Sequence, residues 1–383
     1  MADLNQDESI ESLMNRVYQL PWGRDMLQLL EQVIALAIES GDKAVEFEAK
    51  SLVTSCALEI GDNDLMLSSF TWCMGLYESD RQLFTFSKRL NTNALLWRYK
   101  WIVPYLDRYP SFSLQQAEDL LSDMESHYKR AGLGRSGVIS TRLKHALHVG
   151  DDAATSYWHS ALIEIPRDSH SDCQACYIAL LADVARSRGD TEEALRLLDE
   201  MRTKNLRCRE EPRTAQNLAL VDLVLVGRID EAKRHVARTY GTYRLTPKYI
   251  SRLAEHLEFW VVAGNLTRAK QLMSDHLAWL TDRITSDSAR LEFLASTCLT
   301  LRALDLADRG NQVIEPAARP ELASYFEAAA PKYSAASLFE PALAAAETLA
   351  RAFDQRNGNT FRSDRLAKIW RRADGVGVPE GTR

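Results

Sequence analysis

The chain has 383 residues, of which 46% are hydrophobic and 26% charged, so it can bury a core and is not a disordered or low-complexity polymer. Its 47 basic and 53 acidic residues give a net charge of -6, which argues against binding to the phosphate backbone of nucleic acid. We find neither a signal peptide nor an apolar run of the ~20 residues that cross a membrane. Six cysteines are too few for a disulfide framework. We therefore expect a cytoplasmic protein that inserts into no membrane and binds no nucleic acid.

Apolar residues recur at spacings of three and four along most of the chain, and period-two runs are almost absent, so we expect an all-α fold. A lead segment, residues 1–21, precedes a first helix expected from Trp22 to Ser40. Later helices are separated by a glycine followed by a polar residue, a pair that ends one helix and caps the next. These pairs begin at Gly41, Gly61, Gly150, Gly189, Gly227 and Gly264.

The spacing of these pairs predicts a repeat. From Gly150 the intervals are 39, 38 and 37 residues, the range in which a helix hairpin recurs once per structural unit. Pro110 and Gly310 mark two further turns, because proline cannot continue a helix and glycine ends one. We predict a right-handed α-solenoid of about seven antiparallel hairpins over residues 22–310.

Aromatic residues are dense between Asn93 and Tyr109, where Trp97, Trp101 and Tyr105 recur every four residues. At helical spacing inside an array such residues are typical of core, and we favour that interpretation. The alternative is an exposed stripe that stacks on bases or anchors a peptide.

The run Gly132-Leu-Gly-Arg-Ser-Gly137 fits the dinucleotide-binding pattern by its letters. That motif requires a preceding strand, whereas residues 113–130 are strongly helical, so we interpret the run as a loop between repeats. His145, His148 and His159 are too weakly patterned for a metal site, and histidines in a last helical turn also complement the helix dipole. No motif predicts a catalytic residue, and we do not expect an enzyme.

Cysteines and a histidine gather in one part of the sequence. Cys173 and Cys176 open the first helix of a hairpin, Cys208 follows its second helix, and His170 lies three residues before the first cysteine. Three thiolates and an imidazole suit a closed tetrahedral zinc site, which would join one repeat to the next. Reduced thiols packed between helices are the favoured alternative, and a redox pair is the third. The only cofactor that the sequence suggests is this structural zinc.

Three of the turns carry a further pattern: Gly189-Asp-Thr-Glu-Glu-Ala194, Gly227-Arg-Ile-Asp-Glu-Ala232 and Gly264-Asn-Leu-Thr-Arg-Ala269. They resemble the turn and second helix of the tetratricopeptide repeat, in which a small residue at the alanine position lets the two helices pack closely. The resemblance covers residues 173–280, and the chain as a whole is similar to uncharacterised bacterial proteins of divergent tetratricopeptide repeats. It implies a superhelix that binds a peptide in a concave groove lined by first helices. The groove positions that it implies, with side chains facing solvent, are Lys144, Asp183, Arg186, Asn217, Glu255 and Glu258.

The end of the chain differs in composition. Residues 311–374 are rich in alanine and contain four prolines, which we expect to cut the helices short and to form a capping region. A final helix from Phe361 to Ala373 has an apolar stripe, and its basic residues lie mostly off the stripe. These form either a solvated face or a docking element for an acidic partner. Residues 375–383 read as a flexible tail.

We therefore expect a non-catalytic scaffold that binds a protein or peptide partner in its groove. The mixed charge of the groove positions suits a peptide that carries both signs. The alternative is a regulatory module that senses a small ligand or peptide and controls an effector such as a transcription factor.

Overall fold

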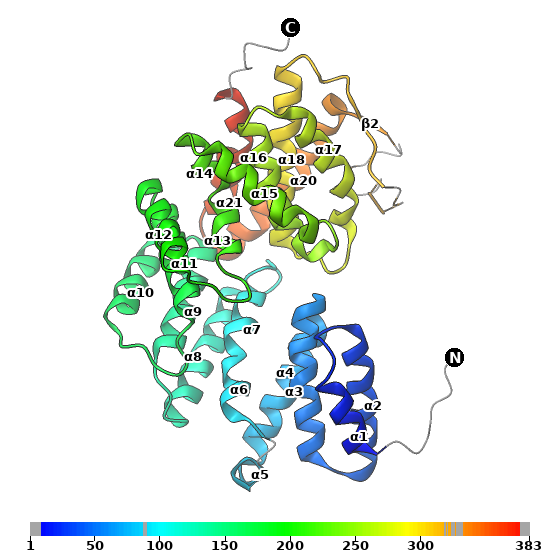
Figure 1. Cartoon of the computed structure of the whole chain (residues 1–383), viewed down its shortest axis with the longest axis vertical. Helices are drawn as coiled ribbons and strands as arrows, with labels where there is room; N and C mark the ends of the chain where they lie inside the picture. Colours follow the sequence, from blue (N-terminus) through cyan, green and yellow to red (C-terminus); the bar gives the residue numbers. More distant parts are fainter. Residues whose placement is uncertain are drawn as a thin grey trace. The chain divides into compact units, whose positions relative to one another are not determined.

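The computed structural model describes residues 9–86, 90–317, 319, 321, 322, 326 and 332–375. Most of these residues are helical and very few lie in strands, so the predicted all-α class is confirmed (Figure 1). One antiparallel sheet of two short strands pairs Val313 with Ser334 and Ile314 with Tyr333. In the described part of the chain, no helix combines the length and the apolar character needed to cross a membrane.

The chain divides into two compact units, and the first contains residues 1–105 and 120–132. Its helices pack in sequence order, α1 on α2, α2 on α3 and α3 on α4. Their bounds are α1 Ile10–Val17, α2 Arg24–Ser40, α3 Lys43–Ile60, α4 Asn63–Ser79, α5 Arg81–Phe86, α6 Thr92–Trp97, α7 Tyr99–Leu106 and α8 Leu114–Arg130, of which α7 and α8 have one end in the second unit.

The second unit contains residues 106–119 and 133–383. Its α-helices are α9 Ser136–Val149, α10 Asp152–Glu164, α11 Gln174–Ser187, α12 Thr191–Thr203, α13 Arg213–Leu218, α14 Leu220–Leu225, α15 Ile229–Tyr243, α16 Ile250–Val262, α17 Leu266–His276, α18 Asp287–Leu306, α20 Ala335–Asn357 and α21 Phe361–Trp370. Between and after them lie η1 Pro247–Tyr249, η2 Leu277–Thr281, β1 Val313–Ile314, β2 Tyr333–Ser334 and η3 Arg371–Gly375.

The six predicted glycine turns are confirmed, and five of them also have the predicted side-chain cap at the residue after the glycine. Every one of the six glycines has a positive φ, between 73° and 81°, the left-handed conformation that closes a helix. The next residue then accepts hydrogen bonds from the first free amides of the following helix, as in Asp190 with the amide of Glu193 at 3.0 Å. Residues 42, 62, 151, 190 and 265 act in this way, whereas Arg228 caps no amide.

Helix pairs formed by these turns pack closely. α9 packs on α10, α11 on α12, α14 on α15 and α16 on α17, and each pair also contacts the next. The three alanines that follow the turn glycines, Ala194, Ala232 and Ala269, are 3%, 0% and 0% exposed. Small side chains at these places let the paired helices approach each other.

Two expectations about helix boundaries are wrong, and one expected turn takes its positive φ at another residue. Residues 10–17 of the lead segment form helix α1, which Ser9 caps and whose Leu13, Met14 and Val17 are buried. The turn after α18 places its positive φ at Asp308 and not at Gly310. Pro341 does not shorten its helix, because α20 continues through it to Asn357 with its alanine face buried.

The C-terminal helix pair returns to the beginning of the second unit. α20 packs on α18, and α21 packs on both of them (Figure 1). Asn357 and Asn359, at the turn between α20 and α21, donate hydrogen bonds to the carbonyl of Val149 at 3.1 and 2.8 Å. The last carbonyls of α9, which have no partner within their own helix, are thus satisfied by residues more than 200 positions away.

The aromatic segment at residues 93–109 is core, as favoured above. Tyr99 and Tyr105 are 0% and 4% exposed, and Trp97 and Trp101 are half-buried. Pro104 lies inside the short helix α7. The loop at Gly132 follows a helix and not a strand, so the dinucleotide motif lacks the context that it requires.

Candidate functional site

The three cysteines of the predicted metal site lie together. Cys173 is the N-cap of α11, Cys176 stands in its first turn, and Cys208 lies in the loop between α12 and α13. The antiparallel pairing of α11 and α12 brings these points to one end of the hairpin. All three Sγ atoms lie within 4.8 Å of one another, and those of Cys176 and Cys208 are 3.6 Å apart.

Backbone amides surround the sulfurs. The amide of Cys176 lies 3.5 Å from Cys173 Sγ, and the amide of Glu211 lies 3.4 Å from Cys208 Sγ. Although burial acts to raise it, hydrogen bonds from Cys176 and Cys208 hold the pKa of the Cys173 thiol below its usual value. Burial raises the pKa of Cys176. Among its three members, the cluster therefore favours ionisation first at Cys173, which is exposed.

His170 does not join the cysteines. Its ring is buried, and Nδ1 lies 3.2 Å from Ser169 Oγ, while the group of mutually close ligand atoms contains only the three thiols. The loop before α11 explains this position, because Asp168 accepts a hydrogen bond from the His170 amide at 2.7 Å. Three of the four predicted ligands are thus brought together.

The predicted groove positions make internal contacts. Lys144 pairs with Asp172 at 2.7 Å, and Arg186 pairs with Asp183 on its own helix at 2.6 Å. Asn217 is 0% exposed, so the expectation that its side chain faces solvent is wrong. Its Oδ1 accepts a hydrogen bond from His256 Nε2 at 2.8 Å, and its Nδ2 donates to the carbonyl of Arg252 at 3.1 Å, because α13 packs on α16.

Two further groove positions are acids on α16. Glu255 pairs with Arg252 at 2.9 Å and accepts a hydrogen bond from Asn217. Glu258 pairs with Arg372 of η3 at 2.6 Å, and its side chain is only 14% exposed. Burial raises the pKa of Glu258, against the opposing effect of Arg372 and Arg365. The acid is therefore held by a basic segment from the end of the chain.

Asp222 of α14 lies near two of the basic residues that act on these acids, Arg186 and Arg372. Burial raises its pKa, while Arg186, Arg372 and Lys368 act in the opposite direction. We call Asp222, Glu255 and Glu258 the acidic inner face, a name taken from the groove that the sequence predicts, because the helices that carry them, α14 and α16, are the first helices of their hairpins. Sequence reasoning missed Asp222, although its single charge in an apolar run marked it.

The end of the basic C-terminal segment, η3, lies against this face, whereas α21 packs on α18 and α20. The apolar side chains of Leu366, Ile369 and Ala373 are buried in the core, as the predicted stripe requires. Arg362 is 4% exposed and donates to the carbonyl of His148 at 2.8 Å, so the expectation that it lies on a solvated side is wrong. η3 packs on α16 and α18.

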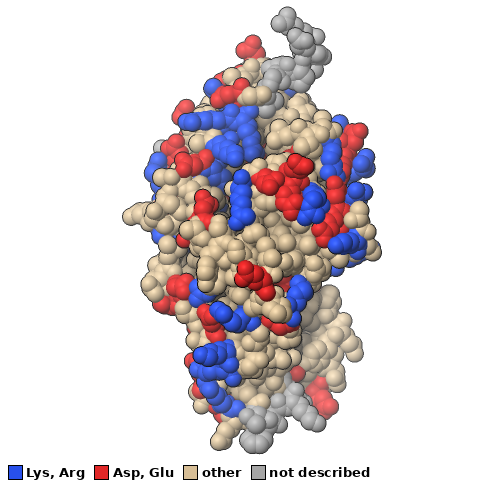
Figure 2. Space-filling model, turned by 90° about the vertical axis from the view of Figure 1, so that its left-hand side faces the viewer, with Lys and Arg blue, Asp and Glu red and all other residues tan. Residues whose placement is uncertain are grey.

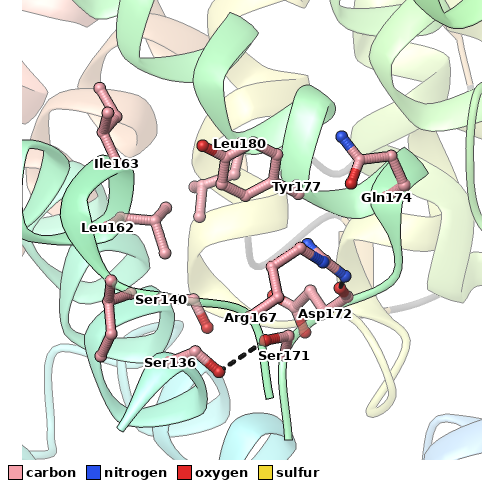
Figure 3. A pocket seen from close by; sticks show the side chains of 11 residues that line it. Ser136, Ser140, Leu162, Ile163, Arg167, Ser171, Asp172, Gln174, Tyr177 and Leu180 are labelled. Atoms are coloured by element: carbon pink, nitrogen blue, oxygen red, sulfur yellow. Dashed lines mark hydrogen bonds between the residues drawn. The ribbon is translucent and has the colours of Figure 1, made fainter. Parts of the chain in front are cut away.

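A hollow lies between the first turns of α9 and α11 and the end of α10 (Figure 3). Ser136 and Ser171 face each other there with their hydroxyl oxygens 2.7 Å apart, Arg167 lies beside Ser171 and Asp172, and Tyr177 lies near Leu180. Its cavity volume of about 180 Å³ is below the ~300–1,000 Å³ of small-molecule sites. It does not favour the sensor alternative.

A cluster that the sequence did not predict lies in the first unit. His127 Nε2 is 3.2 Å from Glu78 and 3.3 Å from Asp123, and the hydroxyl of Tyr99 donates to Asp123. The hydrogen bond from His127 holds the pKa of Asp123 below its usual value. Arg130 lies 2.9 Å from the histidine ring, so its charge balances the carboxylates and we interpret the group as an ion network. The signal was the spacing of four between Asp123 and His127.

His145, His148 and His159, the histidines considered for a metal site in the sequence, lie apart from the cysteine cluster. His145 Nδ1 lies 2.7 Å from Asp107, and burial, with Arg362 and Arg356 nearby, lowers the pKa of His148 well below its usual value. His159 is half-buried. Among the described residues these three are not in a common ligand cluster.

Charges of both signs are interspersed on the face that Figure 2 shows. Pairs at helical spacing are typical, such as Arg196 with Glu193 and Glu200 on α12. Such exposed pairs contribute little stability.

No protein-family model matches the sequence, and no curated protein matches it either. The class of the protein is therefore defined by its fold, an all-α protein of packed helix hairpins.

Proposed function

We propose that this chain is a non-catalytic, cytoplasmic scaffold for protein–protein interaction, built as a right-handed superhelix resembling tetratricopeptide repeats. Support comes from the hairpins, which pack in sequence order with small residues at their closest contacts. A preformed array needs no ordering of its own when a partner binds, so the binding free energy is not reduced by that cost.

The observation that carries the proposal is the docking of the basic C-terminal segment on the acidic inner face. Arg372 contacts Glu258 at 2.6 Å, and Lys368 and Arg372 both lie near enough to Asp222 to affect its pKa. α21 begins beside the end of α9, where Phe361 packs on Gly150, and η3 reaches α16. The segment thus crosses from one first helix to another.

The partner that fits this face is a basic amphipathic helix. The C-terminal segment serves as the template for this partner: the apolar stripe of α21, which packs on α18 and α20, is buried, and Arg372 pairs with an acid of α16. Half-buried acids discriminate strongly, since leaving one unpaired costs more than pairing gains. This partner replaces the mixed-charge peptide expected from the sequence.

The test uses a fluorescent synthetic peptide of residues 361–375 as the basic helix and the full chain as receptor, measured by anisotropy. Arg372→Glu in the full chain weakens the internal contact, and we expect the peptide to bind roughly tenfold more tightly than to wild type, which corresponds to one pair of ~1.4 kcal/mol. Glu258→Arg should abolish this gain, and a peptide carrying Arg372→Glu should bind again to the Glu258→Arg chain.

Asp230→Arg serves as the matched control, because Asp230 lies on α15 with an 86% exposed side chain. It should leave peptide binding unchanged. If Arg372→Glu binds the peptide no more tightly than wild type does, or if its gain in affinity survives the addition of Glu258→Arg, the acidic inner face is not the binding surface.

A further inference from the structure

We propose that Cys173, Cys176 and Cys208 together bind one zinc ion, with a water molecule as its fourth ligand. The inference is independent of the proposed scaffold function. It differs from the site expected from the sequence, because no imidazole completes it.

The sulfur positions fit the ion. Tetrahedral zinc with Zn–S bonds of ~2.3 Å places its sulfurs about 3.8 Å apart. Cys176 and Cys208 are at 3.6 Å, and all three sulfurs are within 4.8 Å of one another. Shifts of about 1 Å or less, within the reach of side-chain rotation, complete the geometry.

A second observation is that two of the sulfurs already face hydrogen-bond donors. The amides of Cys176 and Glu211 are directed at two of the sulfurs, and they donate best to a charged acceptor. The sulfurs of Cys173 and Cys176 also lie at the N-terminus of the 14-residue helix α11, where the helix dipole favours negative charge. Glu211 in turn accepts from the Cys208 amide at 2.9 Å, which closes the turn around that cysteine.

The exposure of the cluster determines the fourth ligand. Cys173 and Cys208 are exposed, and in the described part of the chain no histidine or carboxylate joins the three sulfurs. Water therefore occupies the remaining position. Zinc and three thiols give a tris-thiolate complex of net charge −1 and release three protons, with no change of oxidation state.

The ion would fasten the loop after α12 to the start of α11. In that loop, residues 204–212, Leu206 packs on the hydrophobic core of the hairpins, and Cys208 and Glu211 are joined by two hydrogen bonds. Metal binding would thus make local unfolding of this loop less frequent.

The alternative chemistry of the same sulfurs is a disulfide between Cys176 and Cys208. It requires an oxidant to remove two electrons and two protons, and it would remove two of the three ligands. The experiment is therefore run on the full chain under reducing conditions, with thiols counted before metal is added.

Zinc affinity and stoichiometry are measured by competition with a chromophoric chelator, and cobalt is used in parallel for its thiolate charge-transfer absorbance. We expect one ion per chain and slower hydrogen exchange in residues 204–212 with zinc. Cys173→Ser and Cys208→Ser, both at exposed positions, should each weaken zinc more than about 100-fold, since even outer-shell partners are worth roughly 10–100-fold.

Two controls keep the result specific. Cys298→Ala removes a cysteine in the core of the second unit, and His170→Ala removes the nearby imidazole; both should leave zinc affinity unchanged. Absence of stoichiometric zinc in the fully reduced chain, or equal affinity in the serine variants, would overturn the site. A loss of affinity in His170→Ala would overturn the water ligand.

Discussion

Single residues in the second unit show how the turns are fixed. Gly150 and Gly189 have nearly the same left-handed φ, 77° and 76°, but different surroundings. A Cβ on Gly150 would lie 2.2 Å from the ring of Phe361, whereas a Cβ on Gly189 would meet nothing within 4 Å. Gly189 is therefore required only by its left-handed backbone, whereas Gly150 is required both by its backbone and by the ring of Phe361.

This pair gives a prediction at the residue scale. Gly189→Ala should cost about 1–2 kcal/mol for the left-handed backbone, and Gly150→Ala should cost a further ~1–3 kcal/mol because Phe361 must move. Urea denaturation of the two variants measures the difference. Equal losses would mean that α21 does not pack on the end of α9.

His256 is a second such residue. It is 0% exposed, and burial, helped by His235 and His276, lowers its pKa to about 3. The neutral ring bonds Asn217 and Thr239 at 2.8 and 3.2 Å. Both bonds are made by Nε2, so protonation in the folded state would place the added hydrogen on Nδ1, a buried atom without a hydrogen-bond partner among the described residues.

The lowered pKa of His256 makes the free energy of unfolding depend on pH. Below about pH 6.5 the unfolded chain takes up a proton at this histidine and the folded chain does not, so stability is lost as pH falls from about 6.5 toward 3. Between pH 7 and 5 the loss from His256 should be roughly 2 kcal/mol. The His256→Gln variant should lose less than wild type over this range in urea titrations. Parallel curves would show that His256 titrates normally.

At the scale of elements, the helix hairpins were predictable where local chemistry fixes them. The Gly-Asp pairs located turns because the left-handed cap and the side-chain cap each need a particular residue type. α1 could have been found from Ser9 and the spacing of its buried residues. The continuous helix through Pro341 could not, because its stability comes from the burial of Leu338, Ala342 and Ala346 against other helices.

The alanines at the hairpin contacts give the prediction at this scale. Ala194→Leu and Ala232→Leu should each overpack the pair and destabilise the chain by about 1–3 kcal/mol. Ala153→Leu on α10 is the control, since Ala153 is exposed and the same substitution there meets no neighbouring helix. If Ala194→Leu and Ala232→Leu leave the urea midpoint unchanged, the paired helices do not pack closely at these alanines.

At the scale of the whole second unit, contacts that join distant parts of the sequence were beyond prediction. The cysteine cluster was found because a hairpin relates its two ends, but the position of His170 depends on a loop hydrogen bond to Asp168. The pairing of Glu258 with Arg372 spans 114 residues and has no local signal. The sequence could suggest a basic docking helix, but not that the chain itself supplies its acidic surface.

The central claim is that the acidic inner face recognises this helix by charge, and hydrogen exchange of residues 361–375 in the full chain tests it most directly. Four proteins are compared: wild type, Glu258→Arg, Arg372→Glu and the double exchange of both charges. We predict exchange about fivefold faster in each single variant, corresponding to ~1 kcal/mol of lost coupling, and restored protection in the double variant. The same protection in all four proteins would contradict the claim.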